Sequence, residues 1–136
     1  MGTVKVRKVV IDTNIVVSGL LFGGVTGEIV DLWKKRKISP LCSGEIVEEY
    51  LRVLAYPKFS LTESEIDFLL SQEILPWFTV VQVGRGKAYV KADPSDDKFI
   101  WCALAGKAEG IITGDEHLLG LHSSPVPIFS VMEFLK

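Results

Sequence analysis

The chain has 136 residues, which is enough for one domain and too few for two ordinary ones. Hydrophobic residues make up 48% of it and charged residues 24%, so it can bury a core, and this composition excludes an intrinsically disordered protein. The 15 basic and 17 acidic residues give a formal charge of −2, which excludes a protein that binds nucleic acid through overall positive charge alone.

The sequence indicates neither a disulfide framework nor a membrane span. Its two cysteines, Cys42 and Cys102, are too few for a framework, and both have apolar neighbours, so we expect them to be packed as buried thiols. No stretch reaches the roughly 18 apolar residues that are needed to cross a bilayer. We therefore expect a soluble, cytoplasmic protein without a membrane partner.

The first part of the chain alternates short apolar runs with helical patterns. Residues 9–11 are β-branched and fit a central strand that is buried on both faces. An apolar segment over residues 15–22 predicts a short buried helix, and glycines 23 and 24 predict a loop. A helix over about residues 26–36 and a second strand over residues 38–42 follow.

Two helices are predicted in the middle of the chain. Ser43 is a suitable N-cap for the first, and Pro57 ends it. Thr62 and Glu65 have the spacing of a capping box and predict the start of the second. We expect these helices to form a hairpin that projects from the sheet, followed by a strand over residues 79–83.

The last part of the chain returns to alternating strands and helices. We expect a deeply packed helix over about residues 95–107, a strand at residues 111 and 112, a short helix that carries Leu118 and Leu119, and a last strand over residues 127–131. Strands that alternate with helices are typical of an α/β fold with a mainly parallel central sheet. The sequence predicts one domain over residues 1–136.

Three aspartates share one placement in this predicted fold. Asp12 closes the first strand, Asp115 closes a later strand, and Asp97 begins the helix between them. Strand C-termini and helix N-termini lie along one edge of a parallel sheet, so these carboxylates are directed to a common crevice. Clustered carboxylates repel one another unless protons or cations intervene, and Mg²⁺ or Mn²⁺ suits such oxygen ligands. The alternative is that each aspartate only caps a helix.

Four motifs, in their order and spacing, resemble the PIN-domain family. They are VVIDTNI (residues 9–15), the helix with Glu48 and Glu49, DPSDD (residues 93–97) and ITGD (residues 112–115). The segment of residues 44–59, with YPKF at its end, and the histidine and two leucines at residues 117–119 are similar to PIN-family toxins of toxin–antitoxin systems. The resemblance extends from about residue 8 to the C-terminus.

The resemblance implies a three-layer α/β/α sandwich and cleavage of single-stranded RNA with Mg²⁺ or Mn²⁺. It also implies a homodimer, and an antitoxin protein as partner. Its four catalytic acids fall on Asp12, Glu49, Asp97 and Asp115, of which Asp12, Asp97 and Asp115 would bind the metal and Glu49 could orient the attacking water. Its supporting polar residues fall on Asn14, Thr113 and Asp96. The helical wheel alone does not separate Glu48 from Glu49, and Asp96 is a serious neighbour of Asp97 that could assist it.

Other functions stay open at this stage. A receiver-like signalling module also binds Mg²⁺ at strand ends, but it needs a late lysine, and the only lysine after Lys107 is the terminal Lys136. A haloacid-dehalogenase-type phosphatase needs an aspartate where Asn14 stands. A PIN scaffold without catalytic activity is the third alternative. We expect His117 and His122 not to bind metal, because they lack the usual ligand spacing.

Overall fold

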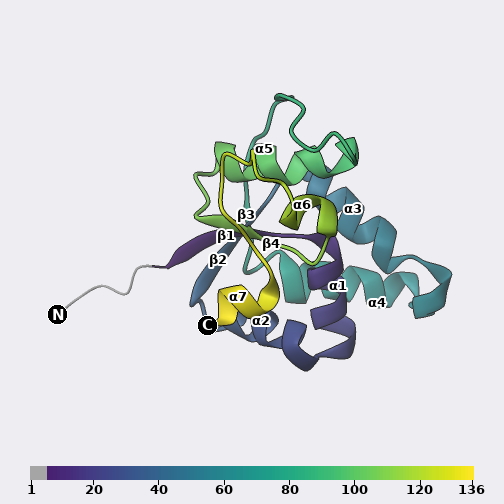
Figure 1. Ribbon diagram of the computed structural model, residues 1–136. Coiled ribbons are helices and arrows are strands. Elements are labelled where there is room, and N and C mark those ends of the chain that lie inside the picture. Colours follow the sequence, from purple (N-terminus) through teal and green to yellow (C-terminus); the bar gives the residue numbers. More distant parts are fainter. Residues whose placement is uncertain (1–5) are drawn as a thin grey trace.

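Five short parallel strands form the centre of the protein in the computed structural model (Figure 1), which describes residues 6–136. Residues 1–5 belong to the predicted domain but lie outside the described residues. The strands lie in the order β3-β2-β1-β4-β5, and every pairing is parallel, which confirms the prediction of a mainly parallel sheet. Their bounds are β1 Arg7–Ile11, β2 Ile38–Cys42, β3 Thr79–Val80, β4 Gly110–Ile112 and β5 Ile128–Phe129.

Helices cover both faces of this sheet, so the fold is the three-layer α/β/α sandwich that the resemblance implied. Figure 1 shows α5 on one side of the strands and α2 with α7 on the other. The helices are α1 Thr13–Phe22, α2 Gly24–Lys34, α3 Gly44–Leu54, α4 Glu63–Phe68, α5 Asp97–Ala105, α6 Glu116–Leu119 and α7 Val131–Leu135. Shorter turns are the 3₁₀ segments Pro57–Phe59 and Pro94–Asp96 and the π-helical segment Leu69–Ile74.

The middle strand β1 positions residues of the candidate site. Its last three residues are fully buried, as a strand covered on both faces requires. Ile11 is paired with Ile112 of β4, so the two strands end at the same level. The residues that follow them, Asp12 and Thr113, are therefore neighbours at the carboxyl edge of the sheet.

The core is continuous beneath the helices. Trp33 and Tyr50 both meet Phe78 edge-on, with ring centroids 5.0 and 6.1 Å apart. Cys42 and Cys102 are buried free thiols, which confirms their predicted packing role. Within residues 6–136 no single helix is long and apolar enough to cross a membrane, and α1 with α2 reaches the length only as a pair bent by 97°.

Several element boundaries differ from the prediction for local reasons. The strand predicted over residues 79–83 has only two residues, and the chain runs on without regular structure to Asp93. The last strand ends at Phe129, because Ser130 and Glu133 form a capping box that starts a helix at Val131. The predicted hairpin is present as α3 and α4, whose connecting turn lies far from the sheet in Figure 1.

Candidate functional site

Asp12 occupies the centre of the site. Its backbone N–H donates to the carbonyl of Ile112 at 2.9 Å, which continues the strand pairing by one residue. Its carboxylate does not cap α1; instead its Oδ2 accepts a hydrogen bond from Thr113 Oγ1 at 2.6 Å. Only 5% of Asp12 is exposed, and this burial, together with the charges of Asp115 and Glu49, raises the pKa of Asp12. Asp12 is thus a buried acid without a helix-capping role.

Thr113 connects Asp12 with Asp115. The same Thr113 hydroxyl that donates to Asp12 accepts a hydrogen bond from the backbone N–H of Asp115 at 3.0 Å. Asp115 does cap a helix, because its Oδ1 accepts from the N–H of His117 at 2.8 Å. The alternative that each aspartate only caps a helix therefore holds for one oxygen of Asp115 and does not hold for Asp12.

Glu49 comes to the same place from α3. The Tyr50 hydroxyl donates to the carbonyl of Ile11 at 2.8 Å and so fixes α3 to the end of β1. The Glu49 carboxylate accepts a hydrogen bond from the Thr13 hydroxyl, next to Asp12. Glu48 is exposed. Of the two acids that the helical wheel could not separate, the structure brings Glu49 to Asp12.

Lys98 is a buried cation beside this glutamate. Its ammonium lies 2.7 Å from Glu49 Oε1 and also donates to the carbonyl of Ser95. Only 5% of its side chain is exposed, against 64% for Arg52, which is 3.8 Å from the same oxygen. Lys98 therefore holds the Glu49 carboxylate in one orientation and offsets its charge.

The carboxylate of Asp97, which was predicted to bind the metal, accepts two backbone hydrogen bonds. Its Oδ1 accepts hydrogen bonds from the backbone N–H groups of Tyr89 and Val90, both at 2.8 Å. These hydrogen bonds fix the irregular segment that precedes α5 to the start of that helix. These bonds could not be predicted from the sequence, because the two amides belong to a segment without regular structure.

Asp96, next to Asp97 in the sequence, lies beside the other acids of the site. Asp96 is 7% exposed, and its Oδ2 is buried without a hydrogen-bond partner among the described residues. Burial, followed by the charges of Asp115, Asp93 and Asp12, raises the pKa of Asp96 to about 8. A 3₁₀ turn over Pro94–Asp96 precedes α5. Because of this turn, the side chains of Asp96 and Asp97 have different surroundings although the two residues are adjacent.

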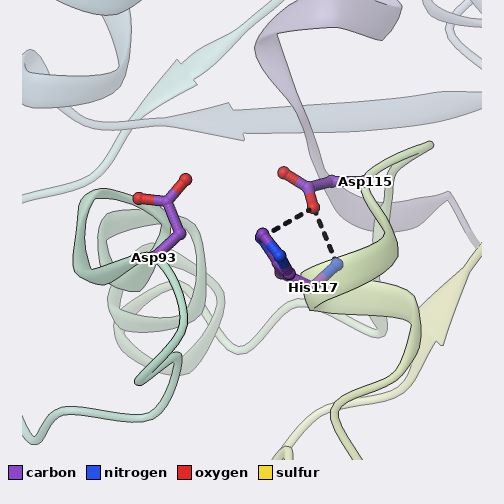
Figure 2. A group of neighbouring side chains, drawn as sticks. All are labelled: Asp93, Asp115 and His117. Atoms are coloured by element: carbon purple, nitrogen blue, oxygen red, sulfur yellow. Dashed lines mark hydrogen bonds and ion pairs between the residues drawn. The ribbon is translucent and has the colours of Figure 1, made fainter.

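Two residues that the sequence analysis did not place in the site lie beside Asp115. Figure 2 shows Asp93, Asp115 and His117 coming together from two separate segments of the chain. One potential ligand atom from each lies within 4.8 Å of the others. Asn14, predicted as a supporting residue, is exposed in the first turn of α1.

This group of acids matches the chemistry of a hard divalent cation. Asp12, Glu49, Asp96 and Asp115 are brought together from four separate segments. Burial, and then repulsion by the neighbouring acids, raises the pKa of Asp12 and of Asp96. An orphaned buried carboxylate oxygen is rare in folded proteins and calls for a cation or a proton. Oxygen-rich sites of this kind suit Mg²⁺ and Mn²⁺.

Thr13 and Lys98 are two further residues of the site that sequence reasoning missed. Thr13 stands inside the motif of residues 9–15, but its hydroxyl has no partner nearby in sequence, so its bond to Glu49 could not be foreseen. For Lys98 there was a signal: it is the one cation in a helix that is otherwise apolar after its first residue. Lysines are almost never fully buried unless they are paired, so a lysine in such a helix indicates a buried acid nearby.

Comparison with known proteins gives a consistent result. The sequence model of the PIN domain matches residues 8–117. An uncharacterized protein of Methanocaldococcus jannaschii is 36% identical over 125 residues, which cover 89% of this chain and 78% of that protein.

Solved structures share the fold at low sequence identity. VapBC2 from Rickettsia felis, bound to a DNA fragment from its promoter, has a TM-score of 0.63 at 14% identity, over 91% of this chain and 98% of that one. PAE2754 from Pyrobaculum aerophilum has a TM-score of 0.61 at 13% identity, over 98% and 96%. FitAcB from Neisseria gonorrhoeae has a TM-score of 0.58 at 17% identity, over 91% of this chain and 98% of that one.

Proposed function

The chain belongs to the PIN-domain family, and on that premise we propose that it is a metal-dependent endoribonuclease that hydrolyses phosphodiester bonds of single-stranded RNA. The observation that carries the proposal is the unpartnered, buried Oδ2 of Asp96, which faces the acids Asp115 and Asp12. An oxygen in that position is costly in a protein without a cation and useful in one that binds it.

The residues that would hold the cation are Asp12, Asp96 and Asp115. Asp96 replaces Asp97 in this set, because the Asp97 carboxylate is occupied by backbone amides. Bound there, Mg²⁺ or Mn²⁺ would supply a Lewis acid that lowers the pKa of a water and stabilises charge on phosphate oxygens. Thr113 orients the Asp12 carboxylate through its hydroxyl.

Glu49 has a different role in the proposed reaction. It is fixed on one oxygen by Thr13 and on the other by Lys98, so its carboxylate does not turn freely. A fixed carboxylate beside the metal ligands can orient the attacking water and accept its proton. The reaction needs no covalent intermediate with the protein.

The biological setting is a further part of this proposal. The family resemblance and the fold shared with VapBC2 and FitAcB support a toxin of a toxin–antitoxin pair, with an antitoxin protein as its partner. We also propose a cytoplasmic homodimer, as the resemblance implies. Growth arrest on expression, relieved by a protein encoded next to this one, would support the toxin role, and normal growth without it would contradict that role.

Cleavage of a labelled single-stranded RNA in Mn²⁺ or Mg²⁺ tests the enzyme directly. We expect wild-type activity that EDTA removes, and a loss of about 100-fold or more in Asp12→Asn, since even residues that only support metal ligands are worth 10 to 100-fold. Asp67→Asn, an exposed acid on α4, is the matched control and should cleave like the wild type. Equal activity in wild type and Asp12→Asn, or none in either, would favour a non-catalytic PIN scaffold.

A further inference from the structure

Two adjoining cavities lie beside the proposed catalytic acids. The inner cavity, of about 390 Å³, is lined by Lys98, whose ammonium contacts Glu49. The outer cavity, of about 470 Å³, is lined by Ser95, the residue before Asp96. Glu45 lines both, so the two cavities are neighbours. Each has the size of a small-molecule site, and together they offer room for more than one nucleotide beside the acids.

The outer cavity combines an aromatic ring with two oppositely charged groups. It is lined by Trp101 of α5, Glu45 in the first turn of α3 and Arg85 of the irregular segment that joins β3 to α5. Glu45 and Arg85 are exposed, and within residues 6–136 neither side chain has a hydrogen bond or an ion pair. Both charged groups are therefore open to a ligand.

Trp101 also fixes the irregular segment beside this cavity (Figure 1). Its Nε1 donates a hydrogen bond to the carbonyl of Lys87 at 2.7 Å. A Cβ on Gly86 would lie 2.7 Å from Nε1 and 2.7 Å from Cδ1 of the same ring, so the backbone of the segment lies directly against the tryptophan. Arg85, the preceding residue, is thereby held at the cavity although the segment has no regular structure.

The chemistry of these groups matches one base of single-stranded RNA. Such bases are recognised by stacking on aromatic side chains and by hydrogen bonds to their Watson–Crick edges. A carboxylate such as that of Glu45 accepts hydrogen bonds and donates none. Guanine has two donors side by side on that edge, N1–H and the N2 amine, which one carboxylate accepts together. Adenine, cytosine and uracil each have an acceptor beside their donor, which would repel the second carboxylate oxygen.

We propose that the outer cavity binds a guanine base of the RNA substrate. Glu45 selects the base, Trp101 is the aromatic surface on which it stacks, and Arg85 contacts a neighbouring phosphate. This proposal rests on the proposed function, because the strand then continues through the inner cavity to the catalytic acids. Cleavage therefore occurs at a fixed distance from a guanosine.

Fluorescence anisotropy of short labelled RNAs in EDTA tests the base preference without cleavage. Oligouridylate is compared with the same RNA carrying one guanosine, adenosine or cytidine. In wild type we expect the guanosine to increase affinity about tenfold or more, as is typical of a bidentate contact to a base. Glu45→Gln should abolish this preference, because an amide has a donor beside its acceptor. No guanosine preference in wild type, or one that survives Glu45→Gln, would overturn the proposal.

Glu63→Gln is the matched control for this change. Glu63 is an exposed glutamate in the first turn of α4, as Glu45 is in α3, so neither variant should unfold the protein. We expect Glu63→Gln to keep the full guanosine preference. Free GMP should bind at least about tenfold more weakly than the guanosine-containing RNA, since it lacks the neighbouring phosphates. Equal affinity would assign the cavity to a free nucleotide and overturn the proposal.

The salt dependence of the same titrations tests the phosphate contact. Arg85→Gln should weaken the binding of all four RNAs alike and reduce the slope of log affinity against log salt by about one. Arg36→Gln, before the start of β2 at the opposite edge of the sheet, should leave the slope unchanged. An unchanged slope in Arg85→Gln would contradict the phosphate contact. Absent RNA cleavage with an intact guanosine preference would contradict the proposed ribonuclease and support the base site.

Discussion

Asp96 and Asp97 are adjacent in the sequence, yet their carboxylates have opposite surroundings. Asp97 accepts two backbone hydrogen bonds, which compensate the loss of water around its charge. Asp96 is as deeply buried but has an oxygen without a partner and three acids near it. At the scale of single residues, this contrast distinguishes Asp97, which stabilises the fold, from Asp96, which we propose as a cation ligand.

The pair Asp96→Asn and Asp97→Asn tests this separation. We expect Asp96→Asn to lose about 100-fold or more of RNA cleavage, while its melting temperature in EDTA at pH 8.5 rises, because the unpaired buried charge that Asp96 carries above its raised pKa disappears. Asp97→Asn should keep most of its activity and become less stable by about 1 kcal/mol, since an amide oxygen still accepts both bonds but without a charge. Cleavage rates and thermal unfolding in EDTA measure both. The opposite ranking of the two activities would restore Asp97 as the catalytic acid.

The ion pair between Lys98 and Glu49 supports a second prediction at this scale. Both side chains are largely buried, so Lys98→Met leaves the glutamate without its nearest cation and should reduce the free energy of unfolding by about 3 kcal/mol. Urea denaturation measures this loss. Glu49→Gln with Lys98→Met should cost less than the sum of the two single changes. Additivity to within about 0.5 kcal/mol would show that the two groups do not interact in solution.

Among the elements, α1 and α2 approach most closely at a glycine. A Cβ placed on Gly19 would lie 2.7 Å from the Thr26 carbonyl oxygen and 2.7 Å from a Val30 methyl group, so the two helices meet at a distance that no larger residue permits. Helix α1 begins directly after Asp12. The packing of α1 on α2 therefore helps to set the position of the buried acid.

Gly19→Ala and Gly27→Ala form a matched pair for this contact. Gly19→Ala should lower the free energy of unfolding by about 1 to 3 kcal/mol, because the new methyl group meets backbone atoms that cannot move freely. Gly27, in α2, has its nearest neighbour at 3.9 Å, so Gly27→Ala should be neutral or stabilise by up to about 1 kcal/mol through helix propensity. Chemical denaturation compares the two. Equal effects would mean that the helices do not meet as closely as described.

For the molecule as a whole, the sequence predicted the layers of the fold and the edge of the sheet where the acids meet. It did not predict every residue at that edge. Apolar runs such as residues 9–11 are readable because a strand buried on both faces has no polar positions. Asp12 and Asp115 could be placed from the sequence for the same reason, because each comes after the end of such a strand. Asp96, by contrast, could not be separated from Asp97, because a 3₁₀ turn decides which of the two faces the acids. His117 was set aside on sequence spacing, and Asp93, from a distant segment, lies near it in the folded chain.

The stability of the whole domain should depend jointly on pH and on divalent cations. The pKa of Asp96 is about 8 in the folded protein against an ordinary value of 3.8, and that of Asp12 is also raised. The folded state therefore binds protons more tightly than the unfolded state, and its stability decreases as pH rises. The contribution is complete below about pH 4 and is lost through pH 8. The carboxylates of Asp115 and Asp93 face Asp96 and strengthen this effect.

A bound cation replaces the proton, so Mn²⁺ should stabilise the domain little at pH 5 and strongly at pH 8. At 100 times the dissociation constant the gain is about 2.7 kcal/mol. Thermal unfolding from pH 5 to pH 8.5, in EDTA and in MnCl₂, measures both profiles. Asp96→Asn should flatten the profile in EDTA, because the group with the most strongly raised carboxyl pKa no longer titrates. A wild-type profile in EDTA that is level or rises between pH 5 and pH 8 would mean that the acids at this edge of the sheet do not need a proton, and hence do not need a metal, to stay together.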